Sequence, residues 1–397
     1  MKTKIKDTAF LETGAFLLSK FGNEVCGDTI MTRRIKEENR YVAVLSDGLG
    51  SGIRANVLSS LTASMALNFT LRHEPVRRTA ETIMQTLPVD NRRNISYSTF
   101  TIIDIDFSGE AVIVEYDNPR LMIIRDNEAY YPNREPFFVQ GTGGEKKLWQ
   151  SAWVLKPDDR LIVVSDGVIQ SGIGGQLTPF GWEEDGFKGY VLALLENQPD
   201  ISARDLAKKI VLRSKANDHL EPKDDISAMV FYYRQPRRML ICSGPPYDNG
   251  RDSQLASSVS DFQGIKVICG GTTAQIISRE LNRPVSVTLS SPQPGVPPQA
   301  SMAGVDLITE GILTLGKLGE TLESGAFDEI PAHSPVALMS KYILDSDIIE
   351  FIVGTRINQA HQDPALPVEL EIRRNIIKRI ARILEEKYLK EVVIHYL

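Results

Sequence analysis

Short apolar runs rich in branched residues alternate with longer periodic segments over the first 235 residues. The short runs predict strands at 40–46, 99–107, 111–116, 121–125, 160–164 and 226–233. The periodic segments predict helices at 53–72, 75–87 and 201–217. The turn residues Ser108-Gly109 and Asp117-Asn118-Pro119 separate three of these strands, which we expect to form an antiparallel meander. A sheet-rich core with paired helices predicts an α+β sandwich.

The rest of the chain repeats strand–loop–helix units. Strands are predicted at 239–242, 265–269, 284–289, 305–309, 348–353 and 391–396. Helices are predicted at 253–262, from Thr273 to Asn282, at 311–323 and at 369–388, with loops over 290–298 and up to Pro367. Such repetition is typical of a smaller α/β domain with a doubly wound, mostly parallel sheet. Gln235-Pro236 interrupts the pattern, so we expect domains at 1–235 and 236–397.

Length and charge exclude some classes of function. The chain has 397 residues, which suits two domains, and 45 basic against 51 acidic side chains give a net charge of −6. Residues 1–235 and 236–397 each carry −3, so neither half has the basic surface that nucleic-acid binding requires. Neither a signal peptide nor a membrane-spanning apolar run is apparent, so we expect a cytoplasmic protein that does not contact a membrane.

The three cysteines are widely spaced and form neither a disulfide framework nor a metal knuckle. Cys242 and Cys269 each end an apolar run, where a small buried hydrophobe is expected. Cys26 lies two residues before Asp28, which leaves a redox-tuned site open as an alternative.

Acidic residues gather at the ends of predicted strands in the first half. Asp47 and Asp166 each stand in a Ser-Asp-Gly tripeptide after a buried strand, Asp224-Asp225 precedes a strand, and Asp28 precedes an extended stretch. Carboxylates at strand ends can converge at one edge of a sandwich, where their mutual repulsion calls for a cation. Oxygen-only donors suit Mg²⁺ or Mn²⁺. The alternative is that Asp-Gly is a common turn dipeptide.

In their order and spacing, these residues resemble a known family. The motifs are Gly27-Asp28, Ser46-Asp47-Gly48-Leu49-Gly50-Ser51-Gly52, Ser98-Thr99, Ser165-Asp166-Gly167 and Asp224-Asp225-Ile226-Ser227. They look like the metal-dependent protein phosphatase (type 2C) family, in its SpoIIE-like bacterial serine phosphatase branch, over residues 1–233. The resemblance implies an α-β-β-α sandwich with two divalent ions, Mn²⁺ or Mg²⁺, at one edge.

The resemblance also implies roles for individual residues. Asp47 would bridge both ions, with Asp28 and the Gly48 carbonyl completing one shell, while Asp166 and Asp224 bind the other ion. Asp225 stands where many relatives have Asn, and it can take the role of Asp224 instead. Asp47 and Asp166 would thus be the central catalytic residues. The ions would clamp a phosphate and activate a water that attacks phosphorus in line.

Two departures from the family pattern keep other readings open. Leu49 replaces the His that many eukaryotic relatives place after the first Asp-Gly, although the SpoIIE-like branch also lacks it. The phosphate-binding Arg of the eukaryotic enzymes has no clear match, and Arg33-Arg34 is expected to be a solvated pair. One alternative is therefore a catalytically weak scaffold. Another is a metal-dependent nuclease or phosphodiesterase, which the missing basic surface disfavours.

The second half carries weaker signals, on loops that follow predicted strands. Gly270, Gly271, Thr272 and Thr273 open a helix, where backbone N–H groups suit a phosphate or carboxylate, and Glu310 follows another strand. Asp306, Arg356 and His361 are further candidates at this edge. The alternatives are turn chemistry, helix capping and a solvated connection. We therefore expect a regulatory or ligand-binding domain that takes a small anion.

Partners follow from the resemblance alone. SpoIIE-like relatives often act on small phosphorylated antagonists of anti-sigma factors, which implies a phosphorylated regulatory protein as the substrate. The branch is often regulated through helix movement and dimerisation, so a homodimer is plausible.

Overall fold

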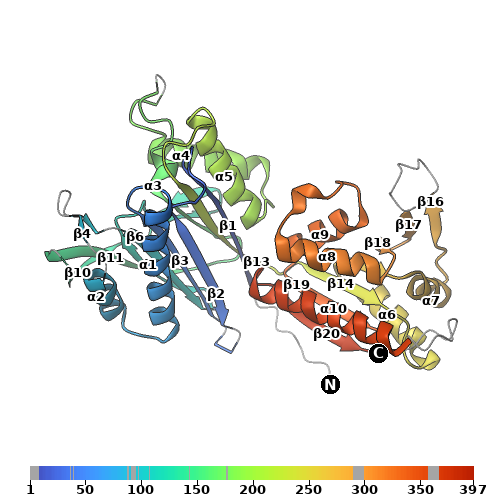
Figure 1. Ribbon diagram of the computed structural model, residues 1–397. Helices are drawn as coiled ribbons and strands as arrows, with labels where there is room; N and C mark the ends of the chain where they lie inside the picture. Colours follow the sequence, from blue (N-terminus) through green and yellow to red (C-terminus); the bar gives the residue numbers. More distant parts are fainter. Residues whose placement is uncertain are drawn as a thin grey trace. The chain divides into compact units, whose positions relative to one another are not determined.

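The computed structural model describes residues 9–397 apart from 36, 39, 87–88, 91–94, 97, 107, 143, 176–177, 289–298 and 356–365. The chain divides into two compact units, Met1–Gln235 and Pro236–Leu397, called here the N-terminal and C-terminal domains (Figure 1).

The N-terminal domain contains two large antiparallel sheets. The first sheet has the strand order β1-β13-β12-β8-β9, with bounds β1 Phe10–Leu18, β13 Ile226–Arg234, β12 Arg160–Val164, β8 Met122–Arg125 and β9 Glu128–Tyr130. The second has the order β10-β11-β7-β6-β3-β2, with bounds β10 Glu135–Gly141, β11 Gly144–Val154, β7 Glu110–Tyr116, β6 Ser98–Asp106, β3 Arg40–Gly48 and β2 Thr29–Ile35. The two-residue strands β4 Val89–Asp90 and β5 Ile95–Ser96 pair antiparallel with each other.

Helices cover one face of each sheet. Apolar residues of α1 (Ile53–Leu71) and α2 (Val76–Thr86) pack on the second sheet, against Val42 and Val44 of β3 among others. The helices α3 (Asp166–Ile169), α4 (Glu183–Asn197) and α5 (Ala203–Asn217) pack on the first sheet. Alternate strand residues such as Ile103 and Val163 point away from the helices and are also fully buried, so they form the core between the sheets. The predicted α-β-β-α sandwich is therefore confirmed.

The predicted meander is wrong at its third strand. Strands β6 and β7 pair antiparallel, but β8 pairs with β12 in the other sheet. Asp117 adopts a positive φ of 52°, and the Asn118 side chain is hydrogen-bonded to Thr99 and Thr101 of β6. The chain is thus anchored at the end of one sheet where it crosses to the other. The strands β1, β10 and β11 and the helix α4 have no counterpart in the sequence prediction.

The C-terminal domain has one seven-stranded sheet with the order β16-β17-β18-β15-β14-β19-β20. Five strands run parallel: β18 Val305–Thr309, β15 Ile265–Cys269, β14 Arg238–Ser243, β19 Ile348–Val353 and β20 Glu391–Tyr396. Strands β16 Ser286–Thr288 and β17 Gln299–Met302 extend the sheet antiparallel at one edge. The first parallel strand along the chain, β14, lies in the middle of the order, as in a doubly wound sheet.

Helices lie on both faces of this sheet. One face packs against α6 (Asp252–Asp261) and α7 (Gly271–Leu281), and the other against α8 (Ile312–Ser324), α9 (Pro335–Asp345) and α10 (Leu366–Glu386). Short 3₁₀ turns occupy Asn249–Arg251 and Phe327–Glu329. The predicted α/β architecture is confirmed, although α9 and β17 were not predicted.

Cys242 and Cys269 face opposite helix layers and are fully buried, as expected for small apolar residues. The predicted loop at 290–298, and the candidates Arg356 and His361, lie outside the described residues. Among the described residues, every helix falls short of the length and apolar character that a membrane crossing requires.

Candidate active site

The two Ser-Asp-Gly motifs occupy different local structures. Asp47 and Gly48 are the last residues of β3, where they pair with Thr99 and Ser98 of β6 rather than forming a free turn. Asp166 follows β12 and is the first residue of the short helix α3. One aspartate thus comes from each of the two sheets.

The remaining acidic residues lie immediately before strands. Asp28 precedes β2, and Asp224-Asp225 precedes β13. Asp28 and Asp225 are almost completely buried. A Cβ atom at Gly27 would lie 2.6 Å from Oδ2 of Asp225, and one at Gly167 would lie 2.1 Å from its carbonyl oxygen. Glycines therefore let the Asp28 and Asp166 segments close on Asp225.

The electrostatics of the site indicate that the five aspartates lie near one another. The pKa of Asp28 rises to about 7, mainly through burial, while the Ser227 and Ser165 side chains lower it and the charges of Asp225 and Asp166 add to the rise. Burial also raises the pKa of Asp47 well above its ordinary value, with added repulsion from Asp28, Asp166 and Asp224. Burial raises the pKa of Asp224, and the charges of Asp166 and Asp225 act in the same direction.

The carboxylate oxygens in this cluster suit a divalent cation. Three buried carboxylate oxygens lack a hydrogen-bond partner among the described residues. They are Oδ1 and Oδ2 of Asp28 and Oδ2 of Asp225. Buried carboxylates without compensation are costly, and the donor set contains only oxygen, which Mg²⁺ and Mn²⁺ prefer. In the same part of the chain, no three His, Cys, Asp or Glu side chains surround a common point closely enough to hold a metal ion.

Several polar groups support the aspartates, and one of them, Gln170, was not singled out from the sequence. Gln170 donates from Nε2 to Oδ2 of Asp166 at 2.9 Å, and its position four residues later on a helix was the available signal. The Ser98 hydroxyl donates to the Asp47 carbonyl oxygen at 2.9 Å. The Ser227 backbone N–H donates to Oγ of Ser165 at 3.0 Å, which ties β13 to the residue before Asp166.

Two secondary expectations about this region change. Burial, followed by the charge of Asp28, raises the pKa of the Cys26 thiol, so its environment opposes the reactive thiolate that a redox role needs. The guanidinium of Arg34 lies over the rings of Phe10 and Tyr41, at 5.2 and 5.5 Å from their centroids. It is therefore packed rather than solvated, whereas Arg33 is exposed.

The structure brings the predicted C-terminal loops together only in part. The Gly270 N–H donates to the Thr309 carbonyl oxygen at 2.8 Å, so the loops after β15 and β18 lie side by side. The Thr273 hydroxyl accepts from the Gly244 N–H at 3.0 Å and thus has a structural role. Gly271, Thr272 and Glu310 are exposed. Asp306 accepts from the Lys266 N–H at 2.8 Å, which is also a structural contact.

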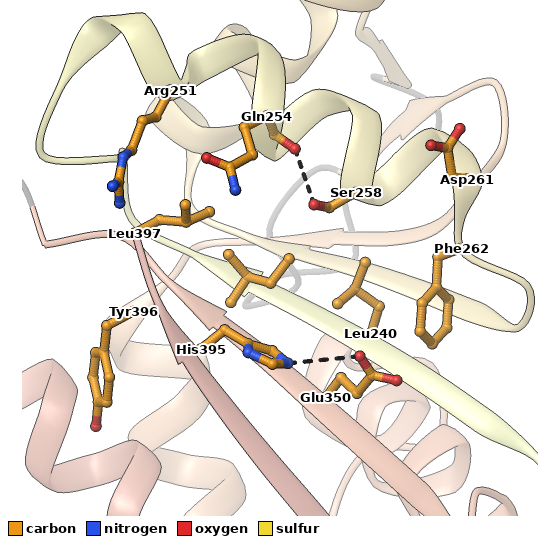
Figure 2. A pocket seen from close by; sticks show the side chains of 11 residues that line it. Leu240, Arg251, Gln254, Ser258, Asp261, Phe262, Glu350, His395, Tyr396 and Leu397 are labelled. Carbon is orange, nitrogen blue, oxygen red and sulfur yellow. Dashed lines mark hydrogen bonds and ion pairs between the residues drawn. The ribbon is translucent and has the colours of Figure 1, made fainter. Parts of the chain in front are cut away.

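A groove of about 500 Å³ lies elsewhere on the C-terminal domain, between α6 and the sheet (Figure 2). Leu240 and Ile352 contribute apolar side chains, and Arg251 and Gln254 extend from the α6 side. Figure 2 shows His395 directed at Glu350, with 3.9 Å between Nε2 and Oε2. None of the predicted ligand-binding residues lines this groove.

The two-sheet sandwich and its acidic strand ends agree with the phosphatase fold that the sequence resemblance implies. Residues 37–234 match the family model described as Stage II sporulation protein E (SpoIIE). This part of the chain is therefore a SpoIIE-like segment. No curated protein matches the chain in sequence.

Several solved structures are similar to the chain. The phosphatase domain of the cell fate determinant SpoIIE from Bacillus subtilis is 19% identical, with a TM-score of 0.45, over 58% of this chain and 94% of that structure. RsbX in complex with magnesium is 19% identical, with a TM-score of 0.40, over 56% and 95%. The Mycobacterium tuberculosis serine/threonine phosphatase PstP/Ppp is 14% identical, with a TM-score of 0.40, over 56% and 99%.

Proposed function

We propose that the N-terminal domain hydrolyses phosphoserine or phosphothreonine in a bacterial regulatory protein, using two Mn²⁺ or Mg²⁺ ions. The single observation that carries this proposal is the cluster of buried aspartates with unpartnered oxygens in a SpoIIE-like segment. The ligands would be Asp28, Asp47, the Gly48 carbonyl and Asp166, with one oxygen from the Asp224-Asp225 pair.

The two acidic neighbours before β13 differ in what they offer. Asp225 uses Oδ1 to accept from the Lys20 N–H at 3.0 Å, which leaves the buried Oδ2 for a cation. Asp224 uses Oδ1 to accept from the Asp225 N–H at 2.9 Å and is more exposed. We therefore favour Asp225 as the inner ligand, with Asp224 on the open side next to Asp166.

The chain's own residues hold negative charge where a phosphate must approach, so catalysis depends on its neutralisation. When bound, two divalent ions would offset this repulsion, polarise the phosphate and lower the pKa of a water nucleophile. Asp47 and Asp166 are held in place by Ser98 and Gln170. Leu49 has no proton to donate, so the position after Asp47-Gly48 provides no general acid.

The proposal is tested by phosphate release from p-nitrophenyl phosphate and from a phosphothreonine peptide, with and without Mn²⁺. We expect Mn²⁺-dependent turnover that falls at least 100-fold in Asp47→Asn and Asp166→Asn, as expected for loss of a central metal ligand. Asp185→Asn is the matched control, because Asp185 is exposed on α4 and pairs with Lys188. Tight Mn²⁺ binding without turnover would favour the scaffold alternative. Undiminished turnover in the two site variants would exclude the proposal.

For the C-terminal domain we propose a site for a small anionic ligand at the carboxyl edge of the parallel sheet. The order of the strands reverses at β14, and ligands of doubly wound sheets bind beside such a reversal. Ser243, Cys269 and Thr309 form one row across β14, β15 and β18. The Ser243 and Thr309 hydroxyls are buried, and neither makes a hydrogen bond within the described residues.

A cationic side chain reaches this edge of the sheet. A Cβ atom at Gly244 would lie 2.5 Å from Nη1 of Arg373, so the guanidinium reaches the loop after β14. The helices α7 and α8 start here without a side-chain cap, which leaves backbone N–H groups for an anion. Titration calorimetry with inorganic phosphate and pyrophosphate tests this site. Binding that is lost in Arg373→Gln supports it, and binding that survives the substitution contradicts it.

A further inference from the structure

Four large apolar side chains are exposed on loops around the aspartate cluster. They are Phe21, Ile173, Phe180 and Leu220, with exposed fractions of 62%, 42%, 77% and 64%. We call these four residues the apolar rim. Single exposed apolar residues are normal on a protein surface, but a group of them beside a polar site marks an interaction surface.

The three segments that carry the rim are hydrogen-bonded to one another. The Phe21 N–H donates to the Pro222 carbonyl oxygen at 2.9 Å, which joins the turn after β1 to the turn before β13. The Gly172 N–H donates to Oδ1 of the buried Asp218 at 2.7 Å. Lys223 donates from Nζ to the Ile173 carbonyl oxygen at 2.5 Å. The rim is therefore assembled from segments distant in the sequence.

The rim also borders the proposed metal ligands. Lys20, next to Phe21, donates its N–H to Asp225, and Lys223 immediately precedes Asp224. The loop that carries Ile173 and Phe180 follows α3, whose first residue is Asp166. A Cβ atom at Gly181 would lie 3.0 Å from the Gln170 backbone, which brings the far end of this loop back to α3.

Leu220 stands out because its local structure does not favour leucine. Its φ is 72°, a left-handed conformation that L side chains other than Asn and Asp rarely adopt. The side chain gains no burial in return, because 64% of its surface is exposed. Neither backbone preference nor core packing accounts for a leucine here, so its exposed side chain is a candidate for contact with a partner.

We infer that the apolar rim binds large apolar side chains that flank the phosphoserine or phosphothreonine of a protein substrate. This inference rests on the proposed phosphatase function and specifies the substrate class of that site. An extended chain advances ~3.3 Å per residue, so side chains two or three positions from the phosphorylated residue lie ~7–10 Å from it. We expect a substrate segment that contacts the rim to place its phosphate at the aspartates, because the rim segments are joined to Asp225 and lie against Gln170.

The test compares two phosphothreonine peptides of equal length and charge, with Mn²⁺ present. One has Leu and the other Ser at the second and third positions on each side of the phosphothreonine. We expect the Leu peptide to have a kcat/KM at least tenfold higher, mainly through a lower KM. In the double variant Phe180→Ser, Leu220→Ser, we expect the two peptides to fall within twofold of each other.

Two controls make the result specific. Val154→Ser removes an apolar side chain that is 61% exposed on β11, opposite Glu110 of β7. That end of the sheet is opposite to Asp47, so this variant should keep the preference for the Leu peptide. Turnover of p-nitrophenyl phosphate should be unchanged in all variants, because this probe has no flanking residues.

The outcomes distinguish this inference from the proposed function on which it rests. Equal kcat/KM values for the two peptides in the wild-type protein, or a preference that survives in the double variant, would overturn the role of the rim. Absence of p-nitrophenyl phosphate turnover by the wild-type protein with Mn²⁺ would overturn both. Loss of peptide preference with intact p-nitrophenyl phosphate turnover supports the inference.

Discussion

Asp28→Asn should stabilise the metal-free protein at pH 8, although the same change should impair metal binding. The pKa of Asp28 rises from the ordinary 3.8 to about 7 on folding, mainly through burial. At ~1.4 kcal/mol per pH unit, the charged form costs about 4 kcal/mol of folding free energy above pH 7. A buried Asn without partners costs ~1–3 kcal/mol, so the expected net gain is about 2 kcal/mol.

The sign of this effect depends on pH. The folded state binds the proton of Asp28 more tightly than the unfolded state, so the cost appears as pH rises from about 4 to 7. At pH 5.5 the folded carboxyl is neutral, and most of the gain from Asp28→Asn should disappear. For a domain of this size, 2 kcal/mol at pH 8 corresponds to an increase of roughly 4–8 °C in Tm.

Tryptophan fluorescence follows this unfolding selectively, because Trp149, Trp153 and Trp182 all lie in the N-terminal domain. Melting curves should be recorded in EDTA and again in Mn²⁺, with Asp185→Asn as the exposed control. Mn²⁺ should raise the Tm of the wild-type protein more than that of Asp28→Asn. A Tm for Asp28→Asn that is equal to or below that of the control in EDTA at pH 8 would refute the reasoning.

Three further predictions follow from particular contacts. Glu12→Gln should destabilise the N-terminal domain by ~3–5 kcal/mol in urea unfolding, because it leaves the buried Arg234 without its carboxylate. An unfolding midpoint equal to that of the wild-type protein would contradict this prediction. Gly167→Ala should abolish Mn²⁺-dependent turnover, since its Cβ would meet a backbone carbonyl oxygen at 2.1 Å, whereas Gly189→Ala, with open space around it on α4, should be active. Cys26 should react with iodoacetamide at pH 8 far more slowly in the folded protein than in urea, because burial raises its pKa, and equal rates would disprove that.

The acidic site was accessible from the sequence because its signals are local. A buried strand that ends in Ser-Asp-Gly indicates where Asp47 and Asp166 lie on their own elements. The order of the motifs, which resembles that of the phosphatase family, indicates which strand ends lie together. The position of Asp47 was still misread, because pairing with Thr99 keeps it within β3 rather than in a turn. Gln170 was missed because its spacing of four residues from Asp166 is a weak signal by itself.

Features that depend on tertiary contacts were not accessible. Turn residues around Asn118 indicated a chain reversal, but sequence periodicity does not determine the sheet in which β8 pairs. Helix α4 contains Gly186 and Gly189, which weaken a helical signal that Phe187 and neighbouring apolar residues otherwise give. The apolar rim joins segments around residues 21, 173, 180 and 220, so it exists only after folding.

A crystal structure grown with Mn²⁺ tests the central claim most directly. Anomalous scattering at the manganese edge should give peaks next to carboxylate oxygens of Asp28, Asp47 and Asp166 and of one member of the Asp224-Asp225 pair. The expected distance from peak to oxygen is ~2.0–2.3 Å, which lies between the usual oxygen distances of Mg²⁺ and Ca²⁺. Two such peaks that share Asp47 as a ligand are the expected result. An absence of anomalous density among these aspartates, at a Mn²⁺ concentration that supports phosphate release, would contradict the account.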